Sequence, residues 1–352
     1  MINCHQHLVP VFVCGLFFFW NFNPATAQIN PLVEEQEQTK HLASLMAGLE
    51  DQRGLLKSGR FKIDCQIEYE KNERRGLSGT IYFKAECFFA EQFKKFRFDQ
   101  SVSQVTINHR QQNEKMTLTS ESKYVLSPDY SIHTEGNNTS VRIFDPNRKP
   151  YGYFSPFDIR VVGMINDTEQ LRGMARSGQR WFLPGVLDHY RGYTLDEINQ
   201  IDNDLYEVSW LYGKNNELKQ VLWIDAAKGF SPTKMLLFIK RGNPKTFHNF
   251  PAVETVVTWA EKQDVWVPVK LVTNNQLNPS HIEMKFEWLT INKKVPDKVF
   301  TVDGFTLPMG RWVTDDNGKK GMIETSIIDH RAGKKRIIKG GGFLPDPLNI
   351  EK

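Results

Sequence analysis

Apolar and polar residues alternate along most of the chain, and the first clear run of this kind covers residues 61–70. Residues 81–89 repeat the pattern, again with their apolar positions on odd numbers. Alternation with a period of two is typical of a strand with one buried face, so the two runs predict a hairpin. Folding that hairpin about Gly76 pairs residues whose numbers sum to 152, which places Cys65 opposite Cys87.

The facing cysteines leave two interpretations open. In an oxidising compartment Cys65 and Cys87 are a disulfide candidate, and a bridge that closes a loop of this length stabilises a fold by roughly 3 kcal/mol. The alternative is a pair of small buried thiols, because not every cross-strand pair meets the geometry of a disulfide.

Further alternating runs follow before Pro296. They cover residues 105–107, 116–118, 130–132, 141–143, 206–212, 221–223, 235–239, 253–259, 265–271 and 282–288. Parallel neighbours need crossover connections of a dozen or more residues, and only the segment 146–204 is long enough to hold several helices. The chain is therefore predicted to be mainly β (α+β), with about a dozen strands in an antiparallel sheet.

Three segments have helical patterns. The segment 31–58 follows a capping Asn30, begins with a proline, and has apolar residues at positions 42, 45, 46 and 49. Segments 157–174 and 194–200 also look helical, the second with a capping box at its start. A sheet with one apolar face must cover it, so we expect these helices on that face, as a permanent core or as a movable lid over a ligand. Candidates for the apolar face, for each of which ordinary core is favoured over ligand contact, are Phe83, Phe89, Val208, Trp210, Trp223, Leu237, Trp259, Phe286 and Trp288.

The N-terminal segment indicates export. No Asp, Glu, Lys or Arg precedes Glu34, and residues 8–20 are a 13-residue apolar run, shorter than the ~20 residues that span a bilayer. Residues 25–27 are Ala-Thr-Ala, which predicts a signal peptide over residues 1–27 with cleavage between Ala27 and Gln28. A buried N-terminal strand is the alternative. Export predicts a periplasmic or secreted protein. After cleavage the chain has no second apolar run of the length expected for a transmembrane segment.

Charge divides the mature chain into two parts. Lys and Arg exceed Asp and Glu by only four, which argues against nucleic acid as a partner. The excess lies in residues 317–352, so we expect a single domain over residues 28–316 followed by a basic C-terminal tail. That tail could touch an anionic surface, or it could be a solvated chain end.

The sequence lacks the common motifs for catalysis, phosphate binding and metal binding. The chain has no G-x-S-x-G, no P-loop, no G-x-G-x-x-G after a strand and no H-E-x-x-H, and its histidines are scattered. No cofactor, metal or catalytic residue is therefore expected. Asp145, Asp158, Asp188 and Asp225 could form a carboxylate pair of the glycosidase type, or each could cap a turn.

Four short motifs resemble a known family. They are Val-Leu-Trp-Ile-Asp at 221–225, Gly-Phe-Ser-Pro-Thr-Lys at 229–234, Trp-Val-Pro at 266–268 and Val-Pro-Asp-Lys-Val-Phe at 295–300. They resemble the outer-membrane lipoprotein-sorting and carrier (LolA-like) exported proteins. The resemblance implies an unclosed antiparallel β half-barrel whose concave face is covered by helices, with an apolar cavity able to accept acyl chains.

Three functions are compatible with these patterns. The first is an exported, non-enzymatic binding protein that carries a lipid or an acylated, lipoprotein-like ligand, since such a site needs apolar lining and no catalytic residue. The second is a structural or interaction module of the envelope with a solid core. The third is an exported hydrolase, which would require two carboxylates, or a Ser and a His, at an open cleft.

Overall fold

A computed structural model describes residues 31–72, 77–108, 114–135, 140–144, 158–165, 182–241, 246–301, 311–314, 320–323, 325–329 and 334–338. Within these residues the helices are α1 (Pro31–Gly54) and α3 (Leu183–Arg191), with the 3-10 turns η1 (Ile159–Val161), η2 (Ala226–Lys228) and η3 (Asp297–Phe300). The strands are β1 (Gly59–Asn72), β2 (Leu77–Ala90), β3 (Lys95–Asn108), β4 (Glu114–Leu126), β5 (Ser131–Glu135), β6 (Ser140–Phe144), β7 (Thr194–Asp202), β8 (Leu205–Tyr212), β9 (Leu218–Asp225), β10 (Ser231–Arg241), β11 (Thr246–Phe247), β12 (Val253–Lys262), β13 (Val265–Asn275), β14 (Ser280–Ile291), β15 (Arg311–Thr314), β16 (Lys320–Ile323), β17 (Thr325–Asp329) and β18 (Lys334–Ile338).

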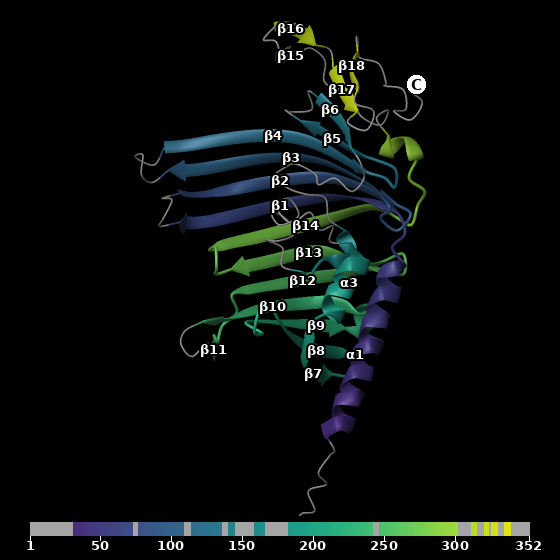
Figure 1. Ribbon diagram of the computed structural model, residues 1–352, viewed down its shortest axis with the longest axis vertical. Coiled ribbons are helices and arrows are strands. Elements are labelled where there is room, and N and C mark those ends of the chain that lie inside the picture. Colours follow the sequence, from purple (N-terminus) through teal and green to yellow (C-terminus); the bar gives the residue numbers. More distant parts are fainter. Residues whose placement is uncertain are drawn as a thin grey trace, which may run out of the picture.

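The sheet is one large open surface, which confirms the predicted fold class. It has 16 strands in the order β18-β17-β6-β5-β4-β3-β2-β1-β14-β13-β12-β10-β9-β8-β7, with β11 beside β10 (Figure 1). Every neighbouring pair is antiparallel except β17 and β6, which run parallel. Two meanders, β1 to β6 and β7 to β14, are joined along a single seam where β1 pairs with β14. Within the described residues the end strands β7 and β18 do not pair, so the half-barrel is unclosed.

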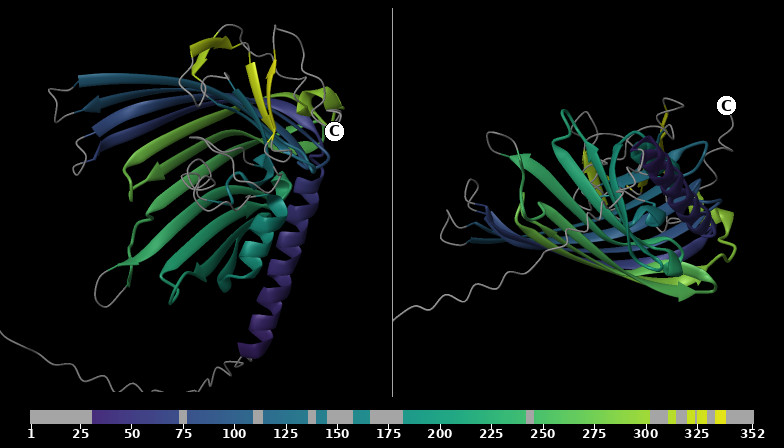
Figure 2. Two further views of the ribbon diagram at one scale, coloured as in Figure 1. Left: turned by 45° about the horizontal axis from the view of Figure 1, so that its top comes forward. Right: turned by 90° about the horizontal axis from the view of Figure 1, so that it is seen from below.

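The sheet curves, and the two helices lie in its hollow (Figure 2). We call the side that carries the helices the concave face and the opposite side the outer face. Alternation puts the buried odd-numbered residues of β1 and β2 on the concave face and their charged neighbours on the outer face. The outer face of the central strands carries opposed charges, including Lys62–Glu287 (3.8 Å) and Lys84–Asp64 (3.9 Å).

Helices α1 and α3 cover the half of the concave face formed by β8 to β10. The predicted apolar stripe of α1 is confirmed: Leu45, Met46 and Leu49 are buried in one cluster with residues of α3 and of these strands. The helix approaches the sheet closely at Gly48, where a Cβ would meet the ring of Phe230 at 2.7 Å. Helix α1 ends at Gly54, four residues before the predicted end.

The predicted register of the first hairpin is wrong by four residues. Cross-strand partners in β1 and β2 sum to 148, so Cys65 lies opposite Phe83 and Cys87 lies opposite Phe61. The turn falls between Asn72 and Leu77, earlier than a turn centred on Gly76. Four residues along a strand correspond to about 13 Å, far beyond the reach of a disulfide. In the structure both cysteines are buried thiols on the same face, and they are not bridged.

The predicted helix at 194–200 is wrong, because these residues belong to strand β7. The pairing of β7 with β8 shifts between Leu195 and Glu197 and again between Gln200 and Asp202. Each bulge adds a residue on one strand, which breaks the period of two and spaces the apolar residues as in a helix. Of the predicted helix at 157–174, the described part contains only the 3-10 turn η1; helix α3 was not predicted.

Less of the two chain ends than of the central sheet belongs to the described residues. Residues 1–27 and the predicted cleavage site lie outside the described residues. The segment 317–352 was predicted without strands, yet its backbone forms β16, β17 and β18, of which the last two extend the main sheet beside β6. Among the described residues, no helix has the length and apolar character needed to cross a bilayer.

We expect Leu49→Ala to lower the free energy of unfolding by about 2–5 kcal/mol, because it removes a buried side chain between α1 and the sheet. Leu55→Ala, just beyond the helix where the side chain is 40% exposed, is the matched control and should cost less than about 1 kcal/mol. Urea titrations followed by tryptophan fluorescence measure both. Equal losses in the two variants would contradict the proposed role of α1 in covering the sheet.

Candidate binding face

Side chains of the concave face form continuous rows that cross the sheet. Because directly opposed residues on neighbouring strands point to the same side, the observed registers define each row. One row crosses eleven strands from β4 to β7: Leu118, Gln104, Ile81, Ile67, Ile282, Thr273, Thr255, Met235, Leu222, Val208 and Ile198. The concave face is therefore one surface shared by both meanders.

One end of the β1 to β4 half of this face is strongly aromatic. Phe61 contacts Trp288 with ring centroids 4.9 Å apart, and Phe89 stacks on Phe93 at 4.1 Å. Phe83 stacks on Phe98 at 5.7 Å in the same cluster. This is the end at which α1 finishes and the β2–β3 turn lies.

Eight of the nine predicted apolar-face residues are buried on the concave side. They are Phe83, Phe89, Val208, Trp210, Leu237, Trp259, Phe286 and Trp288. Trp223 is the exception: it is only partly buried and lies opposite Lys234, whose ammonium is 5.4 Å from the Trp223 ring centroid. Its neighbours Leu222 and Ile224 point to the concave face instead.

The opposite end of the concave face, along the same strands, is more polar and partly open. Thr255 and Thr273 are buried there and share a hydrogen bond of 2.9 Å. At the β4 margin, Met116 is 49% and Leu118 is 58% exposed although both point to the concave side. The concave face thus grades from an aromatic end to a polar margin that carries two exposed apolar side chains.

Arg53, in the last turn of α1, links the helix to three strands. Its Nη1 donates to the carbonyl oxygen of Trp266 (3.2 Å), its Nη2 donates to Ser231 Oγ, and the guanidinium lies 4.0 Å from the ring centroid of Trp259. Burial lowers the pKa of Arg53 to about 9, since a charge in the interior loses its hydration. Among the described residues no carboxylate pairs with it, and its Nε has no hydrogen-bond partner.

A buried ion pair holds the covering segment in place. Asp158 accepts hydrogen bonds from the Arg160 side chain and from the backbone N–H of Leu183, which starts α3. Arg160 also donates to the carbonyl oxygen of Gln92 (3.2 Å) in the β2–β3 turn and lies 4.7 Å from the ring centroid of Phe93. One pair of side chains therefore connects η1, α3 and the turn of a distant hairpin.

That turn needs support, because Glu91, Gln92 and Phe93 all have positive φ angles (52°, 54° and 68°). A left-handed residue other than glycine costs about 1–2 kcal/mol. The Arg160 contact, a hydrogen bond from Gln92 N–H to the carbonyl oxygen of Lys57 (2.9 Å) and the stacking of Phe93 in the core offset this cost.

A second polar contact connects α3 to the sheet. Gln220 Nε2, on β9, donates to the carbonyl oxygen of Met164 (2.8 Å) and to the hydroxyl of Tyr190 (2.6 Å). The Tyr190 hydroxyl itself donates to the same Met164 oxygen. Burial raises the pKa of Tyr190 well above its usual value, so the hydroxyl remains a donor at neutral pH.

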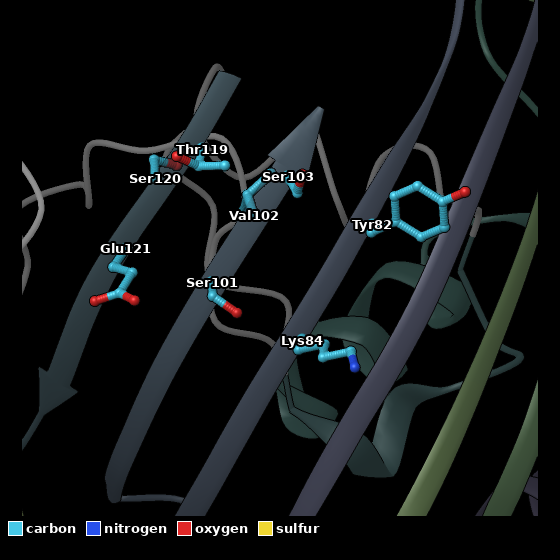
Figure 3. Close-up of a pocket in the computed structure, with 8 residues that line it drawn as sticks. All are labelled: Tyr82, Lys84, Ser101, Val102, Ser103, Thr119, Ser120 and Glu121. Carbon is cyan, nitrogen blue, oxygen red and sulfur yellow. The ribbon is translucent and has the colours of Figure 1, made fainter. Parts of the chain in front are cut away.

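The outer face also has hollows, and their lining is polar. One of about 410 Å³ lies over β2, β3 and β4, and the side chains that alternation places on this face around it are Tyr82, Lys84, Ser101, Ser103, Thr119 and Glu121 (Figure 3). A larger one of about 730 Å³ lies beside it and extends over β1 to β4 and β14, and its lining includes charged residues of both signs. Such a lining suits water and ions better than an acyl chain.

The four candidate carboxylates do not form a catalytic pair within the described residues. Asp158 is in the ion pair with Arg160, Asp188 pairs with Arg191 (2.7 Å), and Asp225 pairs with Lys228 while capping η2. Asp145 lies outside the described residues. The part of the chain that is described also holds no cluster of three metal-ligating side chains.

No family model matches the chain, and neither does any curated protein. Among solved structures, it is similar to a LolA superfamily protein from Nitrosomonas europaea, with 9% identity, a TM-score of 0.38, and coverage of 75% of this chain and 98% of the other. An outer membrane lipoprotein-sorting protein domain from Vibrio parahaemolyticus has 10% identity and a TM-score of 0.34, and the match covers 72% of this chain and 95% of the other. A DUF1329 family protein from Desulfovibrio piger has 11% identity and a TM-score of 0.36, and the match covers 73% of this chain and 96% of the other. Two of these names belong to the class that the sequence motifs resemble.

We expect Asp158→Asn to destabilise the fold by about 3–5 kcal/mol, because it leaves the buried Arg160 without a counter-charge. Asp188→Asn, in an exposed pair with Arg191 on the same covering segment, is the matched control and should cost less than about 1 kcal/mol. Urea unfolding followed by circular dichroism compares them. A loss for Asp158→Asn no larger than that of its control would show that the ion pair does not hold the cover in place.

Proposed function

We propose that the protein is a non-enzymatic binding protein that holds an acyl chain, of a lipid or of an acylated protein, along its concave face. The observation that carries this proposal is the grading of that face from the aromatic cluster around Phe61 and Trp288 to a polar margin with exposed Leu118. An acyl chain with a polar head needs an apolar floor and polar groups at the mouth. Each methylene withdrawn from water contributes ~0.8 kcal/mol to binding.

The way in which the helices are held is also in keeping with a cover over a ligand. Helix α1 packs on β8 to β10 through its apolar stripe and contacts β10, β12 and β13 through Arg53. Helix α3 is attached through Asp158 at its start and Tyr190 near its end. These contacts support the β7 to β10 half of the face and leave the β4 margin with its apolar side chains in water.

The proposal includes export and, with it, an envelope location. It takes residues 1–27 as a cleaved signal peptide and the mature protein as periplasmic or secreted, on the basis of the apolar run and the Ala-Thr-Ala site. A lipid carrier in that compartment would meet both free lipids and acylated proteins. The basic segment 317–352 is proposed to favour anionic surfaces.

Co-purification provides the first test. We expect organic extraction of the purified protein, followed by mass spectrometry, to release lipid in a fixed ratio to protein, and the extracted protein to bind a fluorescent fatty acid. Repeated lipid-free preparations that also fail to bind the probe would overturn the proposal and favour a solid interaction module.

A pair of neighbouring substitutions tests where the probe binds. Val102 on β3 points to the concave face, whereas Ser103 points to the outer face. We expect Val102→Glu to weaken binding of the fluorescent fatty acid by about tenfold or more, because a carboxylate beside an acyl chain loses hydration. Ser103→Glu should leave the affinity unchanged, and circular dichroism checks that both variants are folded. Equal affinities of the two variants would place the probe elsewhere.

A further inference from the structure

The outer face of the sheet changes character over β2, β3 and β4. Over β1 and β14 and over β10 and β12 it carries opposed charges, such as Lys234 and Glu254 (2.8 Å). One row of directly opposed residues from β1 to β4 has only uncharged side chains: Gln66, Tyr82, Ser103 and Thr119. The hollow of about 410 Å³ lies over this row and over the next one, in which Ser101 is the central residue.

Short side chains on β3 give the hollow its shape. Ser101 and Ser103 form its floor, and longer side chains stand on both sides of them, with Tyr82 and Lys84 on β2 and Glu121 on β4 (Figure 3). Neighbouring strands lie about 4.8 Å apart and alternate residues about 7 Å apart, so these positions outline a patch of about 10 Å by 7 Å. A patch of this size fits a compact ligand of one or two rings better than an extended chain.

The ring of Tyr82 provides a flat surface at one side of the hollow. The residue is 43% exposed although it lies in the middle of a long strand, and Figure 3 shows its ring face-on. The face of an aromatic ring is electron-rich and attracts flat groups whose C–H bonds point toward it. Tyr82 therefore offers a stacking surface next to the serine floor.

The hydroxyl groups of the hollow are available to a ligand. Within the described residues, those of Ser101, Ser103 and Thr119 make no hydrogen bond to another protein group, and each can donate once and accept twice. The ammonium of Lys84 lies 3.9 Å from Asp64, which is beyond hydrogen-bond distance, and it adds further donors. The hollow thus presents donors and acceptors together, as a ligand that is itself rich in hydroxyl groups requires.

The chemistry of the lining excludes several other ligand classes. Its two charged side chains, Lys84 and Glu121, have opposite signs, so the hollow lacks the positive excess that a phosphate or a nucleic acid needs. The described residues hold no cluster of three metal-ligating side chains. The hydroxyl floor does not suit an acyl chain. A sugar ring fits what remains, because it has C–H groups on its faces and hydroxyl groups around its edge.

We propose that this hollow is a binding site for a neutral sugar residue of a glycan. The sugar ring stacks on Tyr82, and its hydroxyl groups exchange hydrogen bonds with Ser101, Ser103 and Thr119. The site lies on the outer face, on the opposite side of the sheet from the helices and the aromatic cluster. It therefore does not depend on what the concave face binds.

An array of immobilised oligosaccharides tests the site. We expect the mature chain to bind neutral saccharides, with maltotriose, cellotriose and chitotriose among the probes, since attachment at high density strengthens weak contacts. Titration calorimetry with the saccharide that binds best then compares variants. Tyr82→Ala should weaken binding about tenfold or more, whereas Tyr82→Phe keeps the ring and should stay within about twofold. Ser103→Ala removes one hydroxyl and should weaken binding by about threefold or more.

Two control variants alter similar groups outside the hollow. Phe250→Ala removes a ring that is 56% exposed, and Thr80→Ala removes a hydroxyl from the next row of the outer face on β2. Both should leave saccharide binding unchanged, and circular dichroism confirms that every variant is folded. The Tyr82 and Ser103 variants should also bind the fluorescent fatty acid like the unaltered chain, so a failure of this site is distinguished from a failure of the concave face.

Three outcomes would overturn the proposal. The first is an array on which no neutral saccharide binds. The second is binding to acidic saccharides alone, which would assign the contact to a basic surface elsewhere. The third is a Tyr82→Ala variant that binds the saccharide as tightly as the unaltered chain does.

Discussion

The structure depends on one constraint: the apolar residues of successive strands must all face the same side of the sheet. Opposed residues point to the same side, and from β4 to β7 the registers set mainly apolar positions opposite one another on eleven successive strands. A slip of one residue at any pair would send one part of the apolar surface into water. The large concave face that results must be covered, and α1, η1 and α3 are the described elements that do so.

Attachment of the cover relies on a few buried polar groups as well as on apolar packing. Arg53, the Asp158–Arg160 pair and the Tyr190–Gln220 contact each join a helical segment to a strand or turn that is distant in sequence. Apolar contact alone is not directional, whereas these hydrogen bonds fix where each helix lies. At Gly163, with φ of +81°, a Cβ would meet Val257 at 2.9 Å, so the covering chain passes directly over β12. The result is a cover that is placed accurately on one half of the face.

The strands could be predicted because alternation is a local property of the sequence. The hairpin register could not, since a shift of four residues keeps Cys65 and Cys87 on the same face and leaves the apolar pattern unchanged. Strand β7 was mistaken for a helix because its two bulges alter the spacing of apolar residues. The side chains that hold the cover were not identified: Arg53 and Gln220 bind groups contributed by distant segments, and only the closeness of Asp158 to Arg160 in the sequence gave a signal.

The seam between β1 and β14 has a consequence for folding. Each meander consists of strands that pair with near neighbours in the chain, and such local pairs form early. The seam joins Phe61 to Trp288, so it closes only after almost the whole chain is available. During synthesis from the N-terminus, β1 therefore has an unpaired edge and an exposed apolar face until β14 has been made. Chains in this state are prone to aggregate. We expect cells that make this protein to protect the exposed apolar face of the first meander from aggregation until the second meander has been synthesised.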